Sequence, residues 1–195
     1  VIAELQHDIH PPLYFFMLKG WIALFGSSLV AMRSLSALAG IAVVGMIGVL
    51  AWQCKAARAV VLWSMLLAAL TPMQIHYSQD ARSYSLSCFL MIGGLSTFLW
   101  GIESRRLWAW TVHAIVVALS FYSHSLLMPM VAGYWIAALV MRFAYKEMLC
   151  LFAAHVGALI LAVPALVMML HQDSASALAW TTELEASRPL FLLFL

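Results

Sequence analysis

Long apolar runs separated by short polar links make up most of the chain. A helix needs roughly 20 largely apolar residues to cross a bilayer. The pattern predicts such helices at residues 34–52, 59–75, 83–102, 107–122, 126–141 and 148–170. The polar cluster Ser123-His124-Ser125 separates the fourth run from the fifth, and Pro164 predicts a kink in the sixth. A further apolar segment starts near Pro189.

A shorter apolar run follows Pro12. This run, LYFFMLKGWIALF, has 13 residues and contains Lys19. It is short for a crossing and suits a helix that lies at the membrane surface. Lys19 and Trp21 are typical of the headgroup region. The pattern therefore predicts an interfacial helix on the same side of the membrane as the link between the second and third spans.

The chain begins with Val1 rather than Met and ends on the apolar stretch PLFLLFL. We therefore expect an internal piece of a longer polytopic protein. Residues 1–195 are expected to form a single transmembrane domain that is truncated at both ends. In it, residues 1–29 are the end of an outer loop with the interfacial helix, and residues 30–195 form the transmembrane helices.

The polar links alternate in character along the chain. One set is basic and carries Lys55, Arg58, Arg105, Arg106, Arg142 and Lys146. The other set reads HYSQDARS, SHS and HQDSASALAWTTELEASR, with acids, amides and histidines. Because basic links remain in the cytoplasm, the first set is predicted to be cytoplasmic and the second to face outward. The unusual side-chain chemistry is thus expected at the outer face.

Composition supports a membrane protein. Hydrophobic residues make up 65% of the 195 residues and charged residues 9%, with a mean hydropathy of +0.98. A soluble domain carries more charge than this. The expected fold class is all-α, a polytopic membrane helix bundle with about six complete transmembrane helices plus the N-terminal juxtamembrane helix. The net charge of +2 gives no indication of nucleic-acid binding. The three cysteines lie in or beside apolar runs and are expected to be unpaired packing residues.

The link between the second and third spans contains an acid and a base, Asp80 and Arg82. Charges at a short membrane turn are costly unless they are solvated, paired or used. Arg82 presents several donors in a fixed fork that suits a phosphate. The alternative is an interfacial arginine that pairs with Asp80 and extends to lipid headgroups. Both interpretations stay open from the residues alone.

Asp8 and His10 stand at the start of the interfacial helix, where Pro11 suits the first helical position. Free N–H groups at a helix start favour an anion, and a cationic His10 would add to this. Asp8 with nearby histidines is also a weak divalent-metal candidate. The ordinary alternative is a plain helix start with His10 near the cap.

Histidines within the apolar runs form another group. His113 and His124 are 11 residues apart, close to three full turns, a spacing that allows them to share a helix face. His113 and His155 would be the pair to hold a haem, although packing is the more common role of membrane histidines. His124, at the outer end of its helix, is the better candidate for binding. Arg33 is expected to anchor the first span among headgroups.

Three stretches resemble one family. HDIHPPLYFFMLKGWIALFGSSLVAMRSLSALAG is similar to a stretch of family 39 glycosyltransferases and their bacterial relatives, which include protein O-mannosyltransferases and lipid A aminoarabinose transferases of the GT-C fold. TPMQIHYSQDARSYSL and ALSFYSHSLLM resemble two further family stretches. The similarity follows the order and spacing of roughly residues 1 to 170. Asp-x-His-Pro-Pro together with Tyr-Ser-Gln-Asp-Ala-Arg is more specific than either motif alone.

The resemblance implies an inverting hexosyl- or pentosyltransferase in the cell (inner) membrane. Such an enzyme takes a sugar from a polyprenyl-phosphate carrier at the outer face, and the acceptor is a protein, lipid or glycan. Cationic groups, and a divalent metal in some members, stabilise the carrier phosphate as it leaves. Asp8 and His10 match the acid and the basic position at the end of the family's loop. Arg82 matches the arginine near the lipid phosphate, with Tyr77 and Gln79 as its polar neighbours.

One departure from the family concerns the catalytic base. The family's aspartate lies well before His-Pro-Pro, whereas this chain starts ten residues before Pro11. We therefore expect the catalytic Asp upstream of Val1 and expect this piece alone to be inactive. Two other classes stay open: a transporter or flippase that binds a lipid-linked or anionic substrate through Arg82 and His10, and a structural membrane subunit. Besides the donor, the expected partners are membrane lipids.

Overall fold

The computed structural model describes residues 12–124, 127 and 129–170. Within these residues every element of regular secondary structure is a helix, which confirms the predicted all-α class. The helices are α2 (Leu13–Phe25), α3 (Leu29–Gln53), α4 (Arg58–Leu70), α5 (Pro72–Gln79), α6 (Tyr84–Ser104), α7 (Leu107–Ser123), α8 (Pro129–Val140) and α9 (Tyr145–Leu170).

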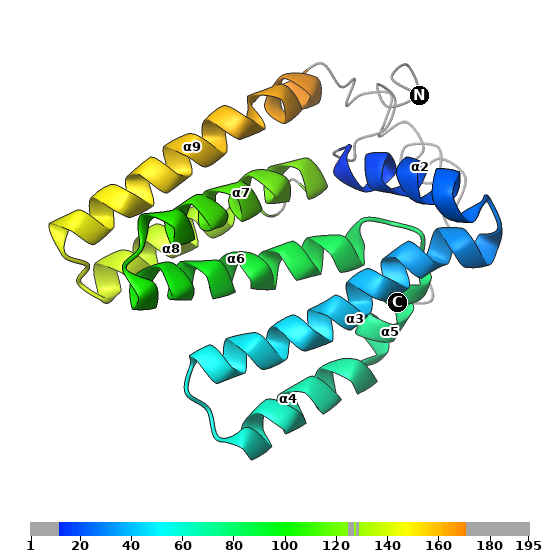
Figure 1. Ribbon diagram of the computed structural model, residues 1–195, viewed down its shortest axis with the longest axis horizontal. Coiled ribbons are helices and arrows are strands. Elements are labelled where there is room, and N and C mark those ends of the chain that lie inside the picture. The colour runs from blue at the N-terminus through cyan, green and yellow to red at the C-terminus, as the bar shows by residue number, and fades with distance from the viewer. Residues whose placement is uncertain (1–11, 125–126, 128, 171–195) are drawn as a thin grey trace, which may run out of the picture.

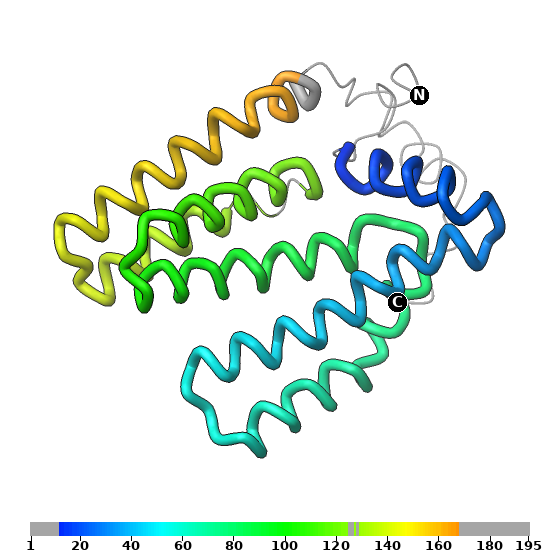
Figure 2. The backbone as a smooth tube through the Cα atoms, viewed as in Figure 1, coloured from blue at the N-terminus to red at the C-terminus, as the bar shows by residue number. Residues whose placement is uncertain are grey.

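The long helices lie side by side as a bundle (Figure 1). α3 packs against α4 and α5 on one side and against α6 on the other, and α7 packs between α6 and α9. α3 and α6 run in the same direction, because Ser36 near the start of α3 contacts Arg82 just before α6, and Gln53 at the end of α3 contacts Ser96. The backbone trace shows α2 crossing the bundle at the end where α3 begins (Figure 2).

The lengths of the helices modify the predicted set of spans. α3, α6 and α9 are long and apolar enough to cross a membrane, and the bent pair α4–α5 would make a fourth span. α7 has 17 residues and α8 has 12, so these two are shorter than the full crossings predicted at 107–122 and 126–141. Pro164 lies inside α9 and does not end it. The described residues therefore form a membrane helix bundle with fewer full-length spans than predicted.

The predicted span 59–75 is broken. α4 ends at Leu70, and α5 begins at Pro72 with a bend of 57° between the two helices. Pro72 has no N–H to continue the ladder of α4 and disfavours helical geometry at Thr71, which is extended with ψ 121. The same ring suits the first position of a new helix. The segment predicted as the polar link is therefore helical as far as Gln79, and the turn between α5 and α6 is short.

α2 covers the 13 residues of the predicted apolar run, but its N-cap is Pro12 and its first helical residue is Leu13, so the first position predicted at Pro11 is wrong. Gly26 ends it with a φ of 84, a conformation that favours glycine. Ser28 then caps α3 by accepting a hydrogen bond from the N–H of Ala31 at 3.2 Å. Trp21 Nε1 donates to the carbonyl of Ala31 and to Ser34 Oγ, each at 3.0 Å. α2 is thus fastened along the first turns of α3.

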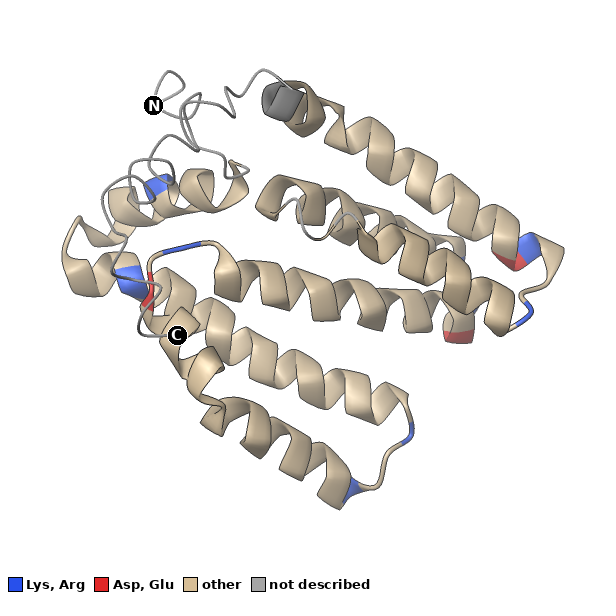
Figure 3. Ribbon diagram, turned by 180° about the vertical axis from the view of Figure 1, so that it is seen from behind, with Lys and Arg blue, Asp and Glu red and all other residues tan. Residues whose placement is uncertain are grey.

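Charged residues gather at the two ends of the bundle (Figure 3). The three links predicted to be basic join α3 to α4, α6 to α7 and α8 to α9, so they share one end. The turn between α5 and α6, which carries Asp80 and Arg82, lies at the other end. Between the ends, the described helices are almost free of charge. This separation is what the alternating links of the sequence predicted.

Candidate functional site

The turn between α5 and α6 holds the charged pair of the candidate site. Arg82 Nε lies 3.6 Å from Asp80 Oδ2, and the backbone N–H of Arg82 donates to the carbonyl of Asp80 at 2.8 Å. The side chains of Arg82 and Asp80 are 63% and 41% exposed. Such an exposed pair adds little to stability. The exposed guanidinium is accessible at this end of the bundle, which suits a role in binding.

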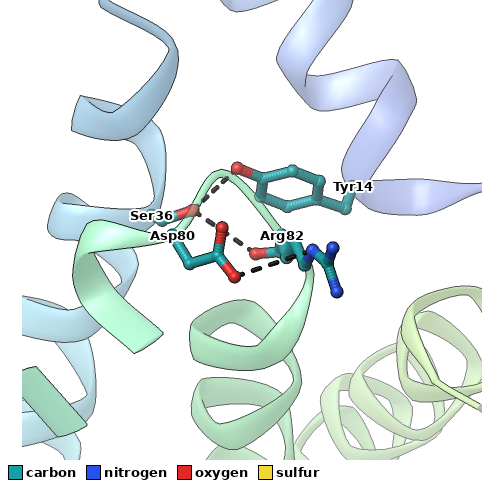
Figure 4. A network of polar contacts seen from close by, with 4 residues as sticks. All are labelled: Tyr14, Ser36, Asp80 and Arg82. Atoms are coloured by element: carbon teal, nitrogen blue, oxygen red, sulfur yellow. Dashed lines mark hydrogen bonds and ion pairs between the residues drawn. The ribbon is translucent and has the colours of Figure 1, made fainter. Parts of the chain in front are cut away.

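A chain of hydrogen bonds fixes this turn against two other helices (Figure 4). Ser36 Oγ of α3 donates to the carbonyl of Arg82 at 3.3 Å. Tyr14 Oη of α2 lies 2.7 Å from the same Ser36 Oγ. Since the Ser36 proton points to Arg82, the Tyr14 hydroxyl is the donor in this contact. The backbone position of Arg82 is thus set jointly by α2, α3 and the turn.

Tyr14 is buried, with 1% of its surface exposed. Burial raises the pKa of its phenol above the ordinary value of 10.0, the hydrogen bond with Ser36 lowers it, and the charge of Asp80 raises it. The net direction is upward. Tyr14 is therefore neutral at physiological pH and keeps the proton that it donates to Ser36.

A row of rings leads from α5 to the end of α7. The ring centroid of Tyr77 lies 4.7 Å from that of Tyr84, which in turn lies 6.3 Å from that of His124. His76 extends the row at 5.5 Å from Tyr77. Three separate elements thus contribute rings to one end of the bundle.

Two serines hold the ends of α6 and α7 together beneath this row. Ser87 Oγ and Ser123 Oγ are 2.8 Å apart and both side chains are buried. Ser87 Oγ also lies 2.9 Å from the carbonyl of Ser83, to which it donates, so Ser123 is the donor to Ser87. His124 follows directly, with an extended backbone at φ −161. The serine pair therefore determines where the His124 ring leaves α7.

A largely apolar pocket of about 420 Å³ opens beside Tyr77 and Tyr84. It lies between α3, the α4–α5 bend and α6. Polar groups on its wall are few. The lining residues are Val43, Ile47, Ala68, Thr71, Met73, Gln74, Tyr77, Tyr84, Ser85 and Cys88. Its size lies within the range of about 300–1,000 Å³ that ligand sites occupy.

The structure brings together only some of the side chains predicted for the site. Tyr77, Arg82 and His124 lie at the same end of the bundle, with Tyr84 between Tyr77 and His124. Gln79 is exposed in the last turn of α5, and its side chain makes no hydrogen bond within the described part of the chain.

Asp8 and His10 lie outside the described residues. The metal expected at Asp8 therefore concerns a residue that the structure does not describe. Among residues 12–124, 127 and 129–170, no three His, Cys, Asp or Glu side chains gather into a group that could hold a metal ion.

His113 and His124 lie in different surroundings. His113 is fully buried within α7, whereas His124 follows the last residue of that helix and is half-buried. The backbone N–H of His124 still donates to the Ser120 carbonyl at 3.1 Å, whereas the backbone of His124 itself is extended. Arg33, expected to anchor the first span, is exposed in the first turns of α3.

The packing of His113 and His155 also bears on the haem alternative. The two ring centroids are 5.4 Å apart, with the rings tilted by 56°. Tyr134 packs against both of them, at 4.9 and 5.8 Å. Axial haem ligands lie on opposite faces of a porphyrin, and this ring packing leaves no slot for one.

Sequence reasoning missed three residues that build the site: Tyr14, Ser36 and Tyr84. Tyr14 looked like part of an apolar helix, yet a buried tyrosine hydroxyl usually has a partner. Ser36 belongs to SLSALAG, a run of small residues of the kind that lines helix contacts in membranes. Tyr84 follows Tyr77 by seven residues, but the break between α5 and α6 hides that the two rings meet.

The fold and this end of the bundle define a multi-pass membrane protein with a polar site beside an apolar pocket. In a comparison with family models, residues 9–171 match the dolichyl-phosphate-mannose-protein mannosyltransferase family. The chain therefore belongs to this family of membrane glycosyltransferases, which confirms the resemblance seen in its three motif stretches. Comparisons with curated proteins and with solved structures give no match.

Proposed function

We propose that the protein transfers a sugar from a polyprenyl-phosphate donor to an acceptor at the outward-facing end of the bundle. The observation that carries this proposal is the position of Arg82 and the ring row Tyr77–Tyr84–His124 next to an apolar pocket. A donor of this kind is an amphiphile with an anionic head and a long hydrocarbon chain. Its two parts match the polar turn and the pocket. Membership of the mannosyltransferase family supports the same reaction class.

Arg82 is the residue proposed to bind the carrier phosphate. Its guanidinium is exposed, and its backbone is fixed by Ser36, so the fork is presented from a defined position. When the sugar leaves, negative charge builds up on the phosphate, and a preorganised cation lowers the energy of that charge. Asp80, 3.6 Å away, would orient the guanidinium. Tyr77 and His124 would line the same phosphate and its sugar.

The pocket between α3, α4–α5 and α6 is proposed to take the first part of the carrier chain. Its wall is mostly aliphatic, and Tyr77 and Tyr84 lie where it meets the polar turn. The bend at Pro72 opens this space, since a straight helix would keep α5 in line with α4. Broken helices are tolerated in membranes where they line such a cavity.

We also propose that Asp8, His10 and a divalent metal help to bind the carrier phosphate. Asp8 would contribute a carboxylate ligand, and the metal would supply positive charge to the leaving phosphate. His10 would add a further cation. On the strength of the family resemblance, we further propose an inverting transfer of a hexosyl or pentosyl group. The acceptor would be a protein, lipid or glycan, and the location the (inner) cell membrane.

The test compares full-length variants in a transfer assay with a polyprenyl-phosphate sugar. Arg82→Ala is expected to lower transfer by about 100-fold or more, the usual cost of losing a charge-stabilising donor. Arg82→Lys should restore part of it, because the charge returns without the fork. Arg58→Ala, at the basic end of the bundle, is the matched control and should be unaffected.

Unchanged transfer by a folded Arg82→Ala protein would rule out the phosphate assignment. The transporter alternative predicts a different result. In that case, the wild-type protein would move the lipid-linked sugar across vesicle membranes without transferring it to any acceptor.

A further inference from the structure

The interior between α6, α7, α8 and α9 contains polar side chains that the proposed site does not use. His113 of α7 is fully buried, Tyr134 of α8 is 4% exposed, and His155 of α9 is half-buried. Their ring centroids are 4.9 to 5.8 Å apart. We call these three residues the His–Tyr node. Aromatic side chains surround it, among them Phe98 and Trp135.

Polar atoms of the node are buried without partners. His113 Nε2, Tyr134 Oη and both ring nitrogens of His155 have no hydrogen-bond partner among the described residues. Ser85 Oγ is the one further side-chain atom of this kind in the same residues. Unpaired polar atoms are costly inside a bilayer, where bulk water cannot reach them. Four such atoms in one cluster indicate a site for a hydrogen-bonding ligand.

The neighbours of His113 determine which ring nitrogen carries its proton. Thr97 Oγ1 donates its single proton to the carbonyl of Gly94 at 3.0 Å. The contact of 3.1 Å between Thr97 Oγ1 and His113 Nδ1 must then use the histidine as donor. His113 therefore carries a proton on Nδ1; since an unpaired charge is costly in this apolar interior, the ring is neutral and its Nε2 is an acceptor. The node as a whole offers this acceptor, the Tyr134 hydroxyl, and one donor and one acceptor on His155.

The packing of α8 leaves room in this region. α8 is held through its side chains, and its backbone approaches the neighbouring helices less closely than α6 approaches α7. Tyr134 reaches so far toward α6 that a Cβ added to Gly94 would collide with its hydroxyl. A groove of about 230 Å³ between α7, α8 and α9 reaches His155 of the node, although neither His113 nor Tyr134 lines it. A water molecule occupies only about 30 Å³.

We propose that the His–Tyr node binds an internal water molecule. The water accepts a hydrogen bond from the Tyr134 hydroxyl and donates to His113 Nε2 and to the unprotonated nitrogen of His155. Three hydrogen bonds are typical of a buried water. Through it α8 is joined to α7 and α9, and through Thr97 to α6, in a part of the bundle where lipid provides no hydrophobic drive for helix packing.

Charge favours water over a metal ion as the occupant. The acids of the described chain are Asp80, Glu103 and Glu147, and they lie at helix ends, away from the node. Two neutral imidazoles and a phenol would leave the charge of a divalent cation largely uncompensated in an apolar interior. A neutral ligand with both donors and acceptors fits the same atoms without that cost.

The first test measures thermal unfolding of the full-length protein in nanodiscs. Tyr134→Phe removes one hydroxyl and leaves the ring, and the midpoint is expected to fall by about 2–10 °C. Tyr145→Phe, at a side chain that is 82% exposed, is the matched control and should leave the midpoint unchanged. A midpoint for Tyr134→Phe equal to or above that of the wild type would overturn the proposal, since the hydroxyl would then have no partner.

The second test uses the wild-type protein and does not depend on a variant folding. Solid-state NMR of ¹⁵N-histidine in bilayers should give His113 as the Nδ1–H tautomer, with magnetisation transfer from water to its ring. His113→Leu and His155→Leu assign these two signals among those of the seven histidines of the chain. An Nε2–H tautomer or no transfer from water would overturn the proposal. So would a Zn²⁺-induced rise in the unfolding midpoint that His113→Leu abolishes, because a metal would then be the ligand.

Discussion

Gly40 lies where α3 and α5 are in close contact. A Cβ built on Gly40 would lie 2.7 Å from the Cβ of Ser78. Carbon atoms pack at about 3.5–4.0 Å, so Gly40→Ala should push α5 away by about 1 Å. Ser78 Cβ is bonded directly to the helix backbone and cannot turn aside. Gln74 adds to the contact by donating to the Gly40 carbonyl at 3.1 Å.

Two opposing contributions determine the free energy of unfolding of the Gly40→Ala variant. Forcing an extra methyl group into a packed contact costs about 1–3 kcal/mol. Alanine is better than glycine in a helix by about 1 kcal/mol. The net loss should therefore be about 0–2 kcal/mol. The functional effect should be larger, since α5 carries Tyr77 and a displacement of about 1 Å in a reactive site can lower the rate about 100-fold.

Matched variants of the full-length protein separate these terms in thermal unfolding and sugar transfer. Gly45→Ala adds the same methyl group to α3 where nothing lies within 4 Å, and should be neutral or stabilising. The double variant Gly40→Ala/Ser78→Gly removes the clashing carbon and should recover transfer, because Ser78 Oγ donates only to the Ile75 carbonyl of its own helix. If Gly40→Ala is as stable and active as Gly45→Ala, the reasoning from helix contact is wrong.

Further predictions concern the hydrogen-bond chain, the orientation and the metal. Ser36→Ala removes the partner of both Tyr14 and the Arg82 carbonyl and should lower the free energy of unfolding by about 1–3 kcal/mol in denaturation experiments. The pKa of Tyr14 is raised above 10.0 in the folded state, so the stabilisation by this residue is complete below pH 10 and is lost as the pH rises through the pKa of the folded state. In a pH titration of stability, a Tyr14→Phe protein should lack that loss. Cys54, exposed at the basic end, should react with a membrane-impermeant thiol reagent only from the cytoplasmic side, and labelling from outside would reverse the proposed orientation. EDTA should lower sugar transfer by the wild-type protein, and added Mn²⁺ should restore it. The activity of Asp8→Asn should respond to neither. Wild-type transfer that EDTA leaves unchanged would show that no metal takes part.

Several elements could be predicted closely because their causes are local. α2 follows the apolar run after Pro12 and ends before Gly26, whose positive φ favours glycine. The long apolar helices follow from run length. The span predicted at 59–75 is instead broken at Pro72, whose ring ends α4 and suits the first position of α5.

Motifs in the sequence predicted part of the candidate site. The residues that complete it could be identified only in the folded chain. Arg82, Tyr77 and His124 were named from the sequence and lie at one end of the bundle. Tyr14 and Ser36 were not named, although they hold the Arg82 backbone. The fold places His113 with Tyr134 and His155, of which only the pairing of the two histidines was considered from the sequence.

The sequence by itself determined the helical membrane class, the separation of charge between the two ends, and the family. These properties depend on run length, composition and short motifs, which are read along the chain. Tertiary structure decided which polar groups meet. Tyr14 reaches Ser36 across 22 positions, and Ser36 reaches Arg82 across 46, because α2, α3 and α6 pack in one particular register. Contacts at that separation depend on the geometry of helix packing, which no local pattern contains.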